Sequence, residues 1–191
     1  MLEVALAMVE LDSIARGYRV VDALVKRSPV RLLEANVVEP GKFLVLFSGG
    51  VAEVEEAFAA ALELGEERIL DRLFLPLVHS AIVPALGGAV DSGDPDCLGV
   101  VETRTVSSAL EACDRALKEA QVALAGLRVV TGLGGKAFFV VHGVQHDVEA
   151  ALEAARAVLE PREALVELQL IPCPHEDFVD VLLRPAPFRL G

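Results

Sequence analysis

The chain contains an internal repeat. Residues 98–103 resemble residues 6–11, which lie 92 positions earlier. The correspondence continues along the chain while its offset grows by two residues at a time: Pro40–Phe43 with Gly134–Ala137, Val54 and Glu55 with Val148 and Glu149, and Pro76 and His79 with Pro172 and His175. Small loop insertions produce such growth. The repeat therefore indicates one fold that was copied in tandem and then diverged.

The repeat predicts two domains, residues 1–90 and residues 96–191. The segment Asp91–Asp96 joins them; it carries Gly, Pro and Asp and has no apolar residue, which is typical of a turn-rich connection. Each half is long enough to form a core. A domain of that size can also leave an apolar face that needs a neighbour.

Composition excludes several classes of protein. Hydrophobic residues make up 53% of the chain, but no apolar run approaches the roughly 18 residues of a membrane span. Glu3 and the lack of a basic stretch beside it argue against a secretory signal. A net charge of −12 argues against a nucleic-acid or anionic-membrane binder. Cys97, Cys113 and Cys173 form no Cys-x-x-Cys motif, so we expect small buried side chains in a reducing cytosol.

Both copies predict the same order of elements: strand, helix, strand, strand, helix, strand, helix. In the first copy we expect strands at 4–10, 30–38, 42–47 and 69–75, and helices at 13–28, 51–68 and 76–86. In the second copy we expect strands at 98–102, 122–130, 136–142 and 164–171, and helices at 105–120, 145–159 and 174–183. The predicted fold class is α/β (α+β), with four mainly antiparallel strands per copy covered by helices on one face. The open face must meet solvent, the other copy or another subunit.

This order and its motifs resemble the bacterial microcompartment shell domain. The resemblance lies in the opening strands, the helix ends, the turns before two lysines and the closing motif: Ala7–Glu10, Gly99–Glu102, Asp22–Lys26, Asp114–Lys118, Lys42, Lys136 and Ile171–Glu176. It covers nearly the whole chain, twice over. Two copies in non-permuted order resemble the tandem-domain trimeric shell proteins. Residues 40–43 and 132–136 are most similar to the propanediol-utilisation branch.

The resemblance implies a structural protein and not an enzyme. In that family three chains form a homotrimer, a flat pseudohexameric tile that packs with other shell proteins around enzymes in the cytoplasm. Small metabolites pass through a central pore, and neither nucleic acid nor membrane is a partner. Closed symmetry accounts for such a ring physically, because it satisfies every interface.

By the same resemblance, the turn between the second and third strands of each copy lines the pore. The expected pore-lining residues are Val38, Glu39, Pro40 and Gly41 in the first copy and Thr131, Gly132, Leu133, Gly134 and Gly135 in the second. The glycines of the second turn allow positive φ or a close backbone approach. An ordinary hairpin turn would also explain them.

Glu39 occupies a position that is a cysteine in the propanediol-utilisation branch, where three such cysteines hold an iron–sulfur cluster. A carboxylate is a poor ligand for that cluster, whose usual ligands are thiolates. We therefore expect no cofactor. Three Glu39 carboxylates would form an anionic ring that disfavours anions and attracts a cation. The alternative is that Glu39 points into solvent.

The resemblance also implies a tile edge. Its expected residues are Lys26, Lys118, His79 and His175. The histidines recur in equivalent places, which suggests a structural or interface role, while a lysine late in a helix is also an ordinary partner of the helix dipole. The family usually has an arginine before the Pro-His pair, but Leu77 and Cys173 stand there. Whether the protein tiles alone is left open.

Other motifs do not support a catalytic or metal site. Gly132–Lys136 lacks the first glycine and the Ser/Thr of a phosphate loop. His142 and His146 have a zinc-like spacing, but they lie on either side of Gly143, one at a strand end and one at a helix start. No Ser-His-Asp set or acid pair stands out, so we expect no catalytic residue and no metal ligand.

A second hypothesis remains open. Tandem α/β domains are also found in small-molecule or metal-binding regulatory proteins built on ferredoxin-like modules. The mass of the assembly separates the two hypotheses. A tile requires a trimer of about 61 kDa, three times the 20.3 kDa chain, whereas a regulatory protein of this kind would more often be a dimer.

Overall fold

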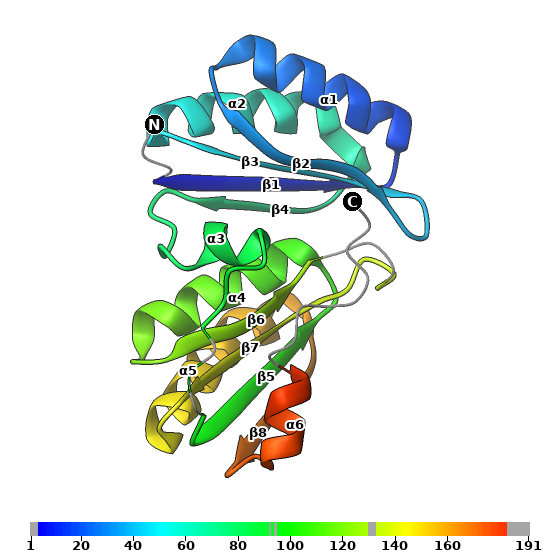
Figure 1. The fold of residues 1–191 in the computed structure, drawn as a ribbon. Coiled ribbons are helices and arrows are strands. Elements are labelled where there is room, and N and C mark those ends of the chain that lie inside the picture. Colours follow the sequence, from blue (N-terminus) through cyan, green and yellow to red (C-terminus); the bar gives the residue numbers. More distant parts are fainter. Residues whose placement is uncertain (1–3, 92, 94, 130–132, 183–191) are drawn as a thin grey trace. The chain divides into compact units, whose positions relative to one another are not determined.

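The computed structural model describes residues 4–182, apart from 92, 94 and 130–132 (Figure 1). The first copy contains β1 (Ala5–Leu11), α1 (Ile14–Arg27), β2 (Arg31–Val38), β3 (Lys42–Gly49), α2 (Val51–Gly65), β4 (Ile69–Leu75) and α3 (Ile82–Leu86). The second contains β5 (Cys97–Thr103), α4 (Val106–Glu119), β6 (Ala123–Arg128), β7 (Ala137–Gly143), α5 (Gln145–Leu159), β8 (Leu165–Pro172) and α6 (Glu176–Leu182). Single 3₁₀ turns follow α2 and α5, at Glu66–Arg68 and Glu160–Arg162.

Each copy forms a four-stranded sheet with the same strand order. The orders are β2-β3-β1-β4 and β6-β7-β5-β8. The pairs β1–β3, β1–β4, β2–β3, β5–β8 and β6–β7 are antiparallel. The register shifts after Glu10 in β1 and after Glu102 in β5, so the same β-bulge occurs at the same place in both copies. The repeat is therefore preserved down to the irregularities of its strands.

The core of the first sheet lies between its strands and two helices. Alternate residues of β1 and β3 point to one face, because side chains along a strand alternate in direction. That face packs against apolar residues of α1 and α2, which cover one side of the sheet (Figure 1). The fully buried members of this core are Ala5, Ala7, Val9, Leu11, Val20, Leu24, Phe43, Val45, Phe47, Val54, Ala57 and Ala61.

Contacts divide the chain into two compact units that do not coincide with the two copies. Among the described residues, unit 1 contains 4–78, 104–111 and 133–137. Unit 2 contains the described part of 79–103 together with 112–129 and 138–182. The start of α4 and the end of the second predicted pore turn thus belong to the same unit as the first sheet.

In unit 2, α5 packs against β5 and β8. A smaller apolar cluster is formed there by Leu98, Ala125 and Val140, with Val100 and Phe138 partly buried beside it. The strand β5 is less completely buried than β1. All seven residues of β1 are buried, whereas Val100 and Glu102 are half-buried.

The predicted order of elements is confirmed, and most predicted bounds agree with the observed ones within two residues. The predicted start of helix α3 is wrong, because the helix begins at Ile82 and not at Pro76. In a helix that began at Pro76 the Ala81 N–H would donate to the carbonyl oxygen of Leu77, but it donates to Nδ1 of His79 at 3.3 Å. In the described part of the chain, every helix is too short or too polar to cross a bilayer.

Candidate pore-lining site

The first predicted pore turn is a tight connection between β2 and β3. The Gly41 N–H donates to the Val38 carbonyl oxygen at 2.9 Å, and Pro40 follows Glu39 through a cis peptide bond. Gly41 has a φ of 109° and open space around it, so backbone conformation and not crowding requires glycine here. Val38 is only 4% exposed, while Glu39 is exposed. The group that this turn offers to its surroundings is therefore a carboxylate.

The second predicted turn leads into β7. The Lys136 N–H donates to the Leu133 carbonyl oxygen at 3.1 Å. Gly134 and Gly135 have φ values of 62° and 82°, which confirms the positive φ expected of these glycines. The other two predicted residues of this turn, Thr131 and Gly132, lie outside the described residues.

The two turns meet within unit 1. A Cβ atom placed on Gly135 would lie 2.5 Å from Nζ of Lys42, and 3.1 Å from both Cδ and Cε of that side chain. The Lys42 side chain therefore lies across the backbone of Gly135, which is buried. The structure thus brings together the ends of two turns that lie about 90 residues apart in the sequence. The sequence predicted that both turns line the pore, but it did not predict a contact between them.

A buried carboxylate lies in the same unit. Glu10 is 0% exposed on β1, and its Oε1 accepts a hydrogen bond from the Ser107 N–H at 2.7 Å. Burial raises the pKa of Glu10, and the nearby charge of Asp71 raises it further. The hydrogen bond from the Ser107 N–H and the charge of Lys42 oppose that rise in pKa. Glu10 is the counterpart of Glu102 in the second copy.

Asp71 completes this polar cluster. It is the cross-strand partner of Glu10 in the β1–β4 ladder, and its Oδ2 accepts hydrogen bonds from Thr105 Oγ1 and, at 3.1 Å, from Ser108 Oγ. Thr105 Oγ1 in turn accepts from the Ser108 N–H at 3.2 Å, as an N-cap does. Two carboxylates of the first sheet thus hold the first turn of α4, where backbone N–H groups favour negative charge.

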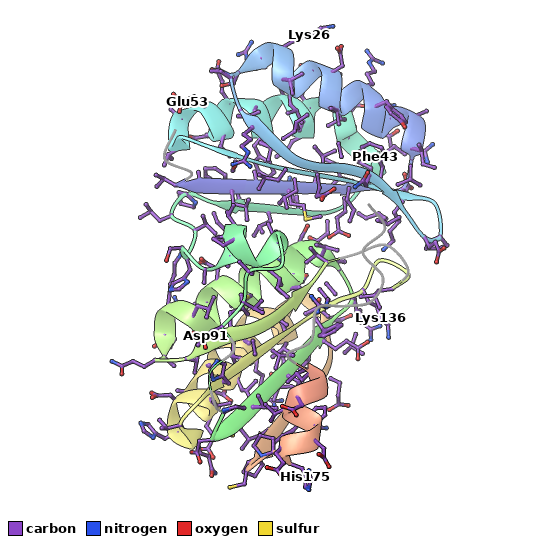
Figure 2. The ribbon with its side chains drawn as sticks, in the orientation of Figure 1. Lys26, Phe43, Glu53, Asp91, Lys136 and His175 are labelled. Atoms are coloured by element: carbon purple, nitrogen blue, oxygen red, sulfur yellow. The ribbon has the colours of Figure 1, made fainter. Side chains whose placement is uncertain are left out.

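The two predicted edge lysines have the same local partner in different surroundings. Lys26 Nζ lies 2.7 Å from Asp22 Oδ2, and Figure 2 shows Lys26 on α1 projecting away from the sheet. Lys118 makes the equivalent ion pair with Asp114 on α4. The Asp22 side chain is 61% exposed, whereas that of Asp114 is 7% exposed. The aspartate of this ion pair is therefore exposed in the first copy and covered in the second.

The two predicted edge histidines share a local contact. Nδ1 of His79 accepts from the Ala81 N–H at 3.3 Å, and Nδ1 of His175 accepts from the Asp177 N–H at the same distance. Each imidazole thus caps the turn that follows it, which supports a structural role. His175 is exposed on the loop before α6 (Figure 2), while the His79 N–H donates to Asp114 Oδ1 at 2.7 Å.

Comparison with protein families decides the family of this chain. The model of the BMC domain matches residues 5–78 and matches again at residues 97–174. The chain belongs to the bacterial microcompartment shell family. As a tandem BMC protein it is a structural component of the shell of a microcompartment, a cytoplasmic body.

Relatives of this shell protein match either most of the chain or about half of it. It is 36% identical over 172 residues to the microcompartment shell protein PduT of Citrobacter freundii, covering 90% of this chain and 94% of that protein. It is 34% identical over 86 residues to the shell protein EutM of Escherichia coli K12, covering 45% of this chain and 87% of that protein. The chain is thus about two such single-domain lengths long.

Solved structures agree with the fold. A microcompartment protein of Desulfitobacterium hafniense matches 91% of this chain and 97% of its own, with 36% identity and a TM-score of 0.82. A fused permuted hexameric shell protein of the RMM microcompartment matches 83% of this chain and 85% of its own, with 26% identity and a TM-score of 0.62.

The donor set of this shell protein does not fit the iron–sulfur cluster of the propanediol-utilisation branch. The exposed group at the first turn is the Glu39 carboxylate, and thiolates are the usual ligands of such clusters. Among the described residues, no group of three His, Cys, Asp or Glu side chains is placed to hold a metal ion.

Sequence reasoning missed a contact that anchors the connection between the copies. His142 Nε2 lies 3.1 Å from Asp91 Oδ1, and that oxygen also accepts from the Gly93 N–H at 2.8 Å. The Gly93 N–H, and with it His142, lowers the pKa of Asp91. His146, which the zinc-like spacing paired with His142, is exposed beside Asp147. The contact between Asp91 and His142 therefore holds the start of the connection against β7.

The expectation of three buried cysteines is wrong for one of them. Cys97 and Cys113 are buried, and burial raises the pKa of both thiols. Cys173 is exposed, with a φ of 47° between β8 and α6. It occupies a turn and not a packed strand or helix, so its side chain faces outward.

Proposed function

We propose that three copies of this shell protein close into a pseudohexameric tile whose central pore passes small metabolites. The turns 38–41 and 131–135 of each chain line that pore. Six similar domains can surround one axis as a closed trimer of tandem pairs, and a closed ring leaves no interface unsatisfied.

The contact between Lys42 and Gly135 carries this proposal. Two turns that alternate around a pore must lie next to each other within a chain, and Lys42 is held across the Gly135 backbone. Their positive-φ glycines allow the chain to turn tightly at its tips. Gly134, at the tip of the second turn, has open space around it and is exposed.

Glu39 sets the charge of the proposed pore. Three exposed carboxylates around one axis form an anionic ring, which disfavours anions and attracts cations. Neutral and cationic metabolites therefore pass more readily than anionic ones. The proposed pore holds no cofactor, and the chain catalyses no reaction.

Lys26, Lys118, His79 and His175 belong to the proposed edge that meets other shell proteins. Lys26 is exposed at the end of α1, where a cation is also favoured by the helix dipole. Leu77 and Cys173 replace the family's edge arginines, so we expect the tile to need other shell proteins as neighbours.

Native mass measurement tests the proposal. We expect a single species of about 61 kDa, three times the 20.3 kDa chain, at micromolar concentration. A dimer of twice the chain mass would favour the regulatory hypothesis, and a monomer would overturn the tile.

A further inference from the structure

Lys42 lies on the face of the first sheet that is opposite to α1 and α2. It is the first residue of β3 and the cross-strand partner of Val38. The next residue, Phe43, packs in the core under the two helices, and successive side chains of a strand point to opposite faces. Lys42 therefore shares its face with Leu44 and with Glu10, the partner of Leu44 in the β1–β3 ladder.

The ammonium group of Lys42 has no counterion in the described part of the chain, where it makes no hydrogen bond and no ion pair. Its charge opposes the rise in the pKa of Glu10, but the two side chains do not pair. Lys26 differs, because its Nζ lies 2.7 Å from Asp22 Oδ2. A lysine carries three N–H donors, and Lys42 is only half-buried. These donors are therefore available to an oxygen-bearing molecule from outside the chain.

The second turn holds the Lys42 side chain in place. A Cβ on Gly135 would lie 2.5 Å from Nζ and 3.1 Å from both Cδ and Cε, so the outer half of the side chain runs along the backbone of this turn. A lysine side chain in solvent samples many rotamers, and packing of this kind restricts them. The ammonium group is therefore fixed where the two predicted pore turns meet.

The two turns place opposite charges at neighbouring positions. Glu39 is exposed and directly follows Val38, the cross-strand partner of Lys42. Leu133, the counterpart of Glu39 in the second copy, is uncharged. Lys136, the counterpart of Lys42, is exposed where the second turn ends (Figure 2). Each chain thus offers one carboxylate at a turn tip and an ammonium group directly behind it.

We propose that Lys42 is a specificity-determining residue of the pore and that its ammonium group forms a cationic ring beside the anionic ring of Glu39. Rings of carboxylates select cations, and rings of lysines select anions. Two adjoining rings of opposite sign therefore favour a small zwitterion over an ion of either sign. Glu39 attracts the cationic end of the zwitterion, and Lys42 donates to its carboxylate oxygens. This inference rests on the proposed function, because it requires the two turns to line one pore.

The two rings act together because they are close. Cross-strand partners such as Lys42 and Val38 have Cα atoms about 4.5–5.5 Å apart, and Glu39 is the next residue after Val38. Salt screens charges over roughly 8 Å at physiological ionic strength. An ion at one ring therefore still feels the other ring, which repels it. A zwitterion avoids this repulsion, since its two ends can align with the two rings.

Lys42→Gln tests the cationic ring. With the tile in a planar bilayer under a KCl gradient, we expect the zero-current potential to shift toward that of a cation-selective pore. Glu39→Gln should shift it in the opposite direction. Lys42→Arg keeps the charge and should retain the potential of the wild type. Lys26→Gln is the matched control, because it removes an exposed lysine charge at the end of α1.

Block of the KCl current tests the class of molecule. Glycine betaine is a zwitterion, and choline is a cation with the same trimethylammonium group. We expect betaine to reduce the conductance of the wild type more than choline does at the same concentration. Its block should weaken in both Lys42→Gln and Glu39→Gln. Equal block by the two probes, or a betaine block that Lys42→Gln leaves unchanged, would overturn the inference.

The outcomes separate this inference from the proposed function. Circular dichroism, thermal melts and native mass measurement establish that each variant is folded and assembles as the wild type does. If the trimer conducts and Glu39→Gln alters its selectivity while Lys42→Gln does not, Lys42 lies outside the ion path and the pore stands. If the wild type is not a trimer or conducts no ions, the proposed function itself fails.

Discussion

Oε1 of Glu10 lies 2.7 Å from the backbone nitrogen of Ser107, and this hydrogen bond joins the first sheet to the first turn of α4. The carboxylate is buried, and among the described residues its second oxygen, Oε2, has no hydrogen-bond partner. Burial and the neighbouring Asp71 raise the pKa of Glu10. Such a group contributes stability below its unfolded-state pKa, and that contribution is lost as pH rises through the folded-state pKa.

Glu10→Gln should therefore change how stability depends on pH. Each unit by which the folded-state pKa exceeds the unfolded one lowers the stability of the wild type by about 1.4 kcal/mol at high pH. Glutamine still accepts from Ser107 but does not ionise. We expect the variant to gain stability relative to the wild type as pH rises from 4 to 8, measured by urea unfolding. A difference that stays constant across this range would contradict the assignment, and Glu63→Gln, at an exposed position on α2, is the control.

Gly135→Ala tests the contact between the two turns. Gly135 needs both a φ of 82° and space beside Lys42, whereas Gly134 needs only its φ of 62°. We expect Gly134→Ala to cost about 1 kcal/mol, the usual penalty for a Cβ in this region, and Gly135→Ala to cost more. Adding Lys42→Ala should recover the excess in a double-mutant cycle of unfolding free energies. Equal costs for both glycines would show that Lys42 does not press on Gly135.

Gly17→Ala tests the packing of α1 on β3. A Cβ on Gly17 would lie 2.3 Å from ring atoms of Phe43, in a fully packed core. Overpacking of this kind costs about 1–3 kcal/mol, although alanine is the better helix former. Thermal unfolding should show a lower midpoint for the variant, and Phe43→Leu in the same chain should relieve part of the loss. An unchanged or higher midpoint would mean that the helix can move away.

Glu39→Gln tests the charge of the proposed pore. Removing three carboxylates should reduce the preference for cations over anions when the tile is inserted in a planar bilayer and its ion selectivity is measured. Glu63→Gln, on α2, is the matched control. Selectivity that is the same in both variants and in the wild type would place Glu39 away from the path of the ions.

The sequence predicted the fold well wherever its signals were local. The helix expected at 145–159 is observed at those residues, because its apolar stripe is regular and Gly143 precedes it. The turn at Glu39–Gly41 was likewise marked by Pro and Gly. The repeat strengthened the prediction of the order of elements along the chain, because the two copies predicted the same order.

Contacts between distant residues could not be predicted. Glu10 lies in an apolar strand, and the sequence placed it at the polar end of that strand. Its hydrogen-bond partner Ser107 lies 97 positions away. The pair Asp91 and His142 is separated by 51 positions, so no spacing rule could connect them. The difference in burial between α1 and α4 could not be predicted either. The apolar pattern of both helices is similar, and only tertiary structure covers one of them.

Distance measurement between spin labels in the assembled trimer tests the central claim most directly. Labels at Glu39→Cys and, separately, at Lys26→Cys are compared in a chain whose exposed thiol is removed by Cys173→Ser. A pore-lining turn and an outer edge require that the distance between chains be much shorter for position 39 than for position 26. Equal distances, or a shorter distance at position 26, would contradict the account.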